Sequence, residues 1–234
     1  MNHDDKSQAA MSRSPSKITS INIGPRVEVE IFGNVKLTAY EKHPFHHDVR
    51  IDEKGIVGDG HYGRVADEAL DHAVQLCSMD NYNFWEARLN KNLRIGVFGE
   101  SITYEGPNEY SVRVGDVLKI GSVKLQVTGP RIPCAKLAHF IGEDISFPRE
   151  YHQSLRTGIY ARVLVPGRIE ARSQIEFEST DSALPLIAEI AAALLNRAPD
   201  RDWMAALAAE PLLSVMIRTM YTKKLEAISR KGAS

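Results

Sequence analysis

Alternating apolar and polar residues mark the first structured part of the chain as β-strand. Residues 27–31 read Val-Glu-Val-Glu-Ile, the pattern of a strand with one buried face. Gly33-Asn34 follows and predicts a hairpin turn, because this pair favours the backbone of tight turns. A second strand is therefore expected over residues 35–39.

Two later segments repeat this arrangement. Residues 117–120 and 123–127 alternate on either side of a Gly-Ser pair, which predicts a second hairpin. Residues 159–165 and 168–177 flank a Pro-Gly pair and predict a third. Short strands joined by tight turns are typical of a closed or nearly closed β-barrel.

One helix is expected to interrupt the strands. Ser78 is suited to cap it, and Met79, Tyr82, Trp85 and Leu89 recur at the spacing of one apolar helix face. We expect this helix to pack across the barrel as a flanking element.

The composition changes near residue 179, where Ala and Leu become frequent. Residues 183–195 predict a helix with Pro185 in its first turn, Asp200 can cap a second helix, and Pro211 can open a third. The chain thus divides into a disordered polar tail, a mainly β barrel and a small α-helical bundle. These parts cover residues 1–16, 17–178 and 179–234.

Charge and hydropathy narrow the class of protein. The chain has 234 residues, of which 43% are hydrophobic, enough for one well-buried core and a small second unit. Its 29 basic and 30 acidic residues give a formal net charge of −1, so nothing global favours nucleic acid. No apolar run can span a bilayer, and the start lacks the apolar core of a secretory signal. We expect a cytoplasmic protein with no nucleic-acid or membrane partner.

The strongest chemical signal surrounds one of the 2 cysteines. Cys77 ends an apolar run and fits a small buried hydrophobe. Cys134 ends the run Pro-Arg-Ile-Pro-Cys over residues 130–134, in which two prolines restrict the backbone. Arg131 and Lys136 flank it and favour the thiolate, the form that binds soft metals or attacks sulfur. A rigid loop with a buried cysteine explains the same pattern equally well.

A second signal is the glycine-rich stretch over residues 55–64, which contains Asp59. Its backbone N–H groups, together with His61 and Arg64, can receive a phosphate. The glycine spacing matches neither a Walker motif nor a dinucleotide fingerprint. A mobile surface loop is the alternative interpretation.

Two further stretches carry polar groups that can bind ligands. Glu100 and Ser101 lie in a Phe-Gly-Glu-Ser run and can hydrogen-bond a pterin or an amide, although a turn role explains them as well. His46 and His47, with nearby His43 and Asp48, are of residue types that bind zinc. Adjacent histidines point to opposite faces of a strand, so we assign no metal there.

Taken in order, three of these stretches resemble the MOSC family, named for the C-terminal domain of molybdenum cofactor sulfurases. They are Gly-x-x-Gly-Asp at residues 55–59, Phe-Gly-Glu-Ser at 98–101 and Pro-Arg-x-Pro-Cys at 130–134. The family has Asn where this chain has Ser101, and many members carry a His-Gly-Gly turn that residues 65–69 lack. The C-terminal region is similar to the three-alpha domain of a bacterial subgroup.

The resemblance implies a MOSC-type β-barrel with Cys134 as the catalytic residue and as the molybdenum ligand in a molybdopterin-type molybdenum cofactor. It also implies reduction of N-hydroxylated substrates with electrons from a separate reductase. The candidate cofactor-binding residues are Asp59, His61, Arg64, Glu100, Ser101, Arg131 and Lys136. Two alternatives stay open: a carrier whose Cys134 receives persulfide from a separate sulfur donor, and an inactive barrel that serves as an interaction module.

Overall fold

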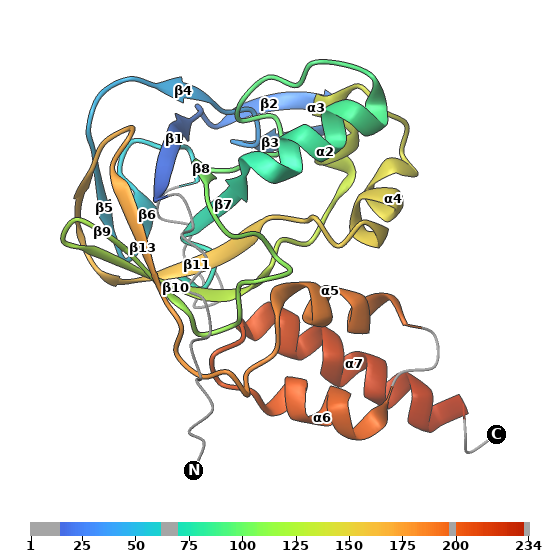
Figure 1. The fold of residues 1–234 in the computed structure, drawn as a ribbon. Coiled ribbons are helices and arrows are strands. Elements are labelled where there is room, and N and C mark those ends of the chain that lie inside the picture. The colour runs from blue at the N-terminus through green and yellow to red at the C-terminus, as the bar shows by residue number, and fades with distance from the viewer. Residues whose placement is uncertain (1–14, 62–69, 197–199, 232–234) are drawn as a thin grey trace, which may run out of the picture.

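A closed seven-stranded β-barrel forms the centre of the computed structural model, which describes residues 15–61, 70–196 and 200–231 (Figure 1). Its strands are β1 (Ser16–Ile23), β7 (Val74–Ser78), β8 (Ile102–Glu105), β9 (Val117–Ile120), β10 (Val123–Pro130), β11 (Ile159–Val165) and β13 (Gln174–Glu178). The order is β13-β9-β10-β11-β7-β8-β1, and pairing of β1 with β13 closes the barrel. The short strand β4 (His43–Phe45) adds to β1. The predicted barrel fold is confirmed.

The helix α2 (Met79–Leu89) lies in the connection between strands β7 and β8. All neighbouring barrel strands are antiparallel except β7 and β8, and a parallel pair requires a crossover. The helix begins after Ser78 as predicted, although the Ser78 side chain makes no capping hydrogen bond. Tyr82 and Trp85 of the predicted apolar face are buried, and α2 contacts β7 and β8.

The first hairpin forms with a different turn from the one predicted. β2 (Val27–Ile31) pairs with β3 (Asn34–Thr38), and the turn is Phe32-Gly33 rather than Gly33-Asn34. Both turn residues have positive φ, 48° and 76°, which matches the twist of the strands. The second predicted hairpin, β9 and β10, is confirmed with its Gly-Ser turn.

The third predicted hairpin is wrong. The segment after β11 is two strands, and the first of them, β12 (Gly167–Ile169), pairs with β5 (Val49–Asp52) instead of β11. Strand β5 also pairs with β6 (Gly55–Ile56), the start of the glycine-rich loop. A turn at residues 170–173 separates β12 from β13 because Arg172 has a φ of 71°, which a regular strand cannot contain.

Three helices follow the barrel: α5 (Ile187–Leu195), α6 (Arg201–Ala209) and α7 (Val215–Lys231). Asp200 caps α6 as predicted, since its carboxylate accepts the backbone N–H groups of Asp202 and Trp203. Pro185 was expected in the first turn of its helix and Pro211 at the start of the last one, but both precede the helices. The Pro185 carbonyl instead accepts the Val114 N–H at 3.1 Å and Leu186 forms a β-bridge with Arg113, so this segment is extended before α5. A turn closed by the Leu213 N–H and the Glu210 carbonyl at 3.2 Å precedes α7.

The helical region shares its apolar core with the barrel. Ile187, Met204 and Ile217 from the three helices belong to the same buried cluster as the barrel interior. At Gly129 in β10, an added Cβ would lie 2.3 Å from Ile217 Cδ1, so α7 packs directly on this strand. A second buried cluster, rich in aromatic residues, surrounds α2 and the segment after β10. No helix in the described part of the chain is long and apolar enough to cross a membrane.

Candidate cofactor site

The Pro-Arg-Ile-Pro-Cys segment connects β10 to a helix that the sequence did not predict. Cys134 is the N-cap residue of this helix, α3 (Ala135–Ile141), and has an extended backbone with φ −145°. Leu137 is buried and anchors the helix, while the backbone N–H of Leu137 donates to the Cys134 carbonyl at 2.9 Å. The Cys134 side chain is half-buried at the edge of the aromatic cluster. The residue is therefore partly exposed and partly packed against hydrocarbon.

Arg131 lies beneath this turn, with 1% of its surface exposed. Its guanidinium carbon is 5.6 Å from the ring centre of Tyr40 and 5.8 Å from that of Tyr151, the last on helix α4 (Phe147–Gln153). Nη2 donates to the Tyr40 hydroxyl at 2.7 Å, and Nη1 is buried without a hydrogen-bond partner among the described residues.

Burial by itself lowers the pKa of Arg131, but electrostatic interactions with Tyr40, Tyr160 and Cys134 raise it above the usual arginine value. The guanidinium accordingly keeps its charge inside the protein. This places one fixed positive charge close to Cys134.

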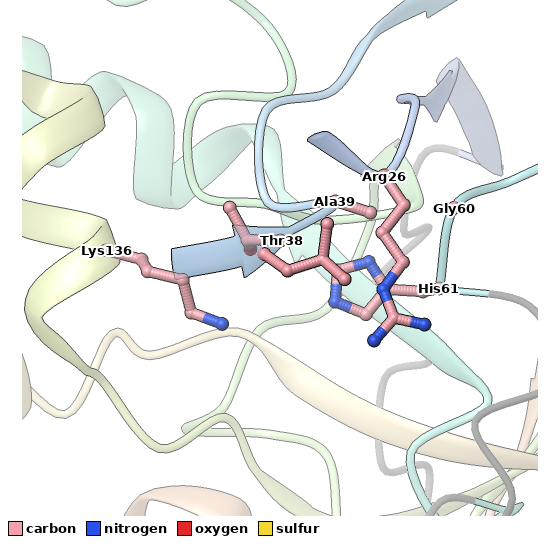
Figure 2. A pocket seen from close by; sticks show the side chains of 7 residues that line it. Arg26, Thr38, Ala39, Gly60, His61 and Lys136 are labelled. Atoms are coloured by element: carbon pink, nitrogen blue, oxygen red, sulfur yellow. The ribbon is translucent and has the colours of Figure 1, made fainter. Parts of the chain in front are cut away.

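Lys136, two residues after Cys134, lines a small pocket (Figure 2). Lys136 enters from α3 on one side, and Arg26 and His61 lie on the other. The remaining lining residues are Leu37, Thr38, Ala39 and Gly60. Two residues predicted from separate stretches, His61 and Lys136, are thus brought together. A cluster of three cationic or titratable nitrogen groups suits an anion such as phosphate.

Arg26 is a member of the pocket that the sequence did not indicate. It follows Pro25 in the connection between β1 and β2, far from the three motifs, and a lone arginine in a loop carries no signal. In the structure, the backbone of Arg26 lies against Gly60 of the glycine-rich loop. A Cβ on Gly60 would lie 2.6 Å from the Arg26 backbone nitrogen, so only glycine permits this approach.

Asp59 and Ser101, both predicted to bind cofactor, meet at a buried lysine. Lys42 has 1% of its surface exposed and pairs with Asp59 Oδ2, and its Nζ donates to Ser101 Oγ at 2.9 Å. Asp59 Oδ1 accepts the backbone N–H of Gly24 at 3.2 Å. These contacts fix the glycine-rich loop behind the pocket. Lys42 lies outside every motif that the sequence indicated, so it was not predicted as part of the site.

Glu100 lies deeper than the predicted contact with a ligand suggests. Its side chain is fully buried, and Oε1 accepts hydrogen bonds from the Tyr82 hydroxyl, from Thr103 Oγ1 at 2.7 Å and from the Gly96 N–H at 3.1 Å. Burial raises the pKa of Glu100. Arg64 and residues 65–69 lie outside the described residues.

The histidine-rich stretch does not assemble a metal site. His43, His46 and His47 are exposed on and after β4. Across residues 15–61, 70–196 and 200–231, no three His, Cys, Asp or Glu side chains are arranged to hold a metal ion.

The chain is therefore a small β-barrel protein with a half-buried cysteine turn and a cationic pocket near the end of β10. The sequence profile of the MOSC domain matches residues 40–176, which is more than half of the chain. The chain belongs to the MOSC family, as the three motifs predicted.

Known proteins agree with this assignment. The chain is 32% identical over 169 residues to the uncharacterized protein YflK of Bacillus subtilis (strain 168), covering 72% of this chain and 76% of YflK. The crystal structure of YiiM from Geobacillus stearothermophilus has a TM-score of 0.74 and 27% identity, covering 90% of this chain and all 100% of that one. A more distant relative, 27% identical, is named Reductase in Gibberella moniliformis (strain M3125 / FGSC 7600) and matches 68% of this chain but 29% of its own length.

Proposed function

We propose that this protein binds a molybdopterin-type molybdenum cofactor and reduces N-hydroxylated compounds, with electrons from a separate reductase protein. The observation that carries the proposal is the connection between two features. Cys134 and Lys136 lie on the same turn, and Lys136 also lines the cationic pocket with Arg26 and His61. The relative named Reductase supports the broader assignment to oxidoreductases.

The residues present fit the cofactor by the chemistry of their donor atoms. A half-buried thiol is a suitable ligand for a soft metal, and Cys134 would hold the molybdenum. Arg26, His61 and Lys136 would hold the phosphate group of the pterin, which needs positive charge and N–H donors. When bound, the cofactor supplies the two-electron redox chemistry.

Residues around Cys134 and the pocket would orient the cofactor and set the charge near it. Arg131 holds a positive charge near Cys134 and favours negative charge on its sulfur. The rings of Tyr40 and Tyr151 lie beside the guanidinium, which is buried from solvent. Lys42 holds Asp59 and so fixes the loop that carries His61. Each of these residues acts by orientation or electrostatics.

Metal analysis tests the proposal directly. Wild-type protein, made in a host that synthesises the cofactor, is expected to contain about one molybdenum per chain, and Cys134→Ala should lose at least about 90% of it. Cys77→Ala is the matched control, because Cys77 is buried elsewhere in the aromatic cluster. Wild-type protein without molybdenum, under conditions that load a known molybdoenzyme fully, would contradict the proposal. A cyanide-labile mass gain that depends on Cys134 would instead favour the persulfide carrier.

A further inference from the structure

The pocket that Lys136 lines has a buried floor and an exposed rim. Thr38 and Ala39, at the end of β3, line it and are both buried. Arg26 and Leu37 line the same pocket but are exposed to solvent. Because the pocket is small, it suits a group of the size of a phosphate, and the rest of a larger ligand has to lie over the rim.

Leu37 gives this rim an apolar side. It is a large hydrophobic residue, and 54% of its surface is exposed. Single exposed hydrophobic residues are common on protein surfaces and need no function. Leu37 differs because it lines a pocket together with Arg26, His61 and Lys136. A ligand held by these nitrogen groups can cover Leu37 and remove apolar surface from water.

The β2–β3 hairpin places Leu37 between the groups that suit a phosphate. At the base of the hairpin, the Gly60 N–H of the glycine-rich loop donates to the Gly24 carbonyl at 2.8 Å. At its tip, the ring of Phe32 packs edge-on against His139 of α3, with ring centres 6.1 Å apart. The hairpin therefore contacts both the loop that carries His61 and the helix that carries Lys136. Figure 2 shows these two residues on opposite sides of Thr38, the neighbour of Leu37.

The partners of Leu37 in the hairpin restrict what can lie over it. Glu28 pairs directly with Leu37, and Glu30 pairs with Val35, so these four side chains share one face of the hairpin. A carboxylate next to Leu37 repels a second anionic group and can accept N–H groups. The part of a ligand that covers Leu37 is therefore uncharged, and a ring offers the largest apolar area for this contact.

We propose that Leu37 determines the specificity of this pocket and selects organic phosphates that carry an uncharged ring over inorganic phosphate. The inference rests on the proposed function, in which Arg26, His61 and Lys136 hold a phosphate group. The phosphate occupies the pocket, and the ring lies over the rim against Leu37. The contacts to the phosphate are common to both kinds of ligand, so Leu37 supplies the difference in affinity between them.

Binding of phenyl phosphate and of inorganic phosphate to metal-free protein tests this inference. Isothermal titration calorimetry at about pH 8 compares the two ligands as dianions. Wild type should bind phenyl phosphate about tenfold more tightly than inorganic phosphate, and Leu37→Ala should reduce this ratio to about twofold. The affinity of Leu37→Ala for inorganic phosphate should equal that of wild type. Leu37→Met, which keeps the apolar area, should restore the ratio.

Two further variants separate the contact with Leu37 from other effects. Val35→Ala is the matched control, because Val35 lies on the same face of β3 and is 65% exposed but does not line the pocket. This variant should keep both affinities. Lys136→Ala should weaken binding of both ligands and keep their ratio, because it removes a contact with the phosphate that they share.

The outcomes that overturn the inference differ from those that overturn the proposed function. Equal affinities of wild type for the two ligands, or an unchanged ratio in Leu37→Ala, overturn the role of Leu37 while the phosphate site stands. An equal loss of the ratio in Val35→Ala also overturns it, because the ring would then bind the hairpin at large. Wild type that binds neither ligand overturns the phosphate site and the inference with it, and wild type without molybdenum overturns the proposed function.

Discussion

The carboxylate of Asp71 accepts the backbone N–H of Val215 at 2.9 Å, although 144 positions separate the two residues. Val215 is the first residue of α7, so a residue at the entrance to β7 caps a C-terminal helix. The other oxygen of Asp71 pairs with Arg162 of β11 at 3.0 Å, and Arg162 Nη2 also donates to the Leu212 carbonyl. These contacts join the helical region to the barrel beside the strand that leads to Cys134.

We predict that Asp71→Ala lowers the free energy of unfolding by about 2–3 kcal/mol, because it leaves Arg162 and a helix N-terminus without their buried partner. Urea unfolding followed by circular dichroism measures this value. Asp48→Ala is the matched control: Asp48 pairs with Arg168 on the surface, where an ion pair contributes about 0–1 kcal/mol. If both variants lose the same free energy of unfolding, the contacts of Asp71 do not stabilise the packing of the helices on the barrel.

Arg26 and Lys136 should control binding of an anion to the pocket before any metal is present. We predict that Arg26→Ala and Lys136→Ala each weaken binding of inorganic pyrophosphate to metal-free protein about tenfold, the effect of one lost charge-assisted hydrogen bond. Isothermal titration calorimetry measures the affinity. Arg50→Ala, which removes an exposed arginine from β5, should leave it unchanged. An equal loss in all three variants would mean that the anion senses only the net charge of the protein.

The barrel and the order of the motifs were predictable from the sequence because both depend on local patterns. Burial was not. Lys42 is buried by partners 17 and 59 positions away, and Arg131 by a tyrosine 91 positions away. A lysine or arginine within a short polar stretch looks exposed, since its counterpart is invisible in the local sequence. The pocket was half predicted for the same reason: His61 and Lys136 lie near recognisable motifs, whereas Arg26 does not.

The stability of the protein should fall as the pH rises above the ordinary range of a carboxyl group. Burial raises the pKa of Glu100 and of Glu109 above the unfolded value of 4.5, so the folded chain binds these protons more tightly than the unfolded chain does. The stabilisation is complete below about pH 4.5 and is lost as the pH rises through the folded-state pKa. Urea unfolding of wild type and Glu100→Gln across this range tests the sign. The variant should gain relative to wild type as the pH rises, and a gain on acidification would contradict the prediction.

Tyr40 should stabilise the buried guanidinium of Arg131 through its hydroxyl group as well as its ring. The hydroxyl accepts Arg131 Nη2 at 2.7 Å and donates to the Phe98 carbonyl at 2.9 Å. We predict that Tyr40→Phe lowers the free energy of unfolding by about 2–3 kcal/mol, because it leaves the buried Arg131 Nη2 without this acceptor and leaves the Phe98 carbonyl with Gln75 Nε2 alone. Tyr151→Phe is the matched control for stability: its ring also packs on Arg131, but its hydroxyl has no hydrogen-bond partner among the described residues. Urea unfolding should give a loss below about 1 kcal/mol for Tyr151→Phe. If the two variants lose the same amount, the aromatic faces alone stabilise the Arg131 charge, and the Tyr40 hydroxyl does not set its position beside Cys134.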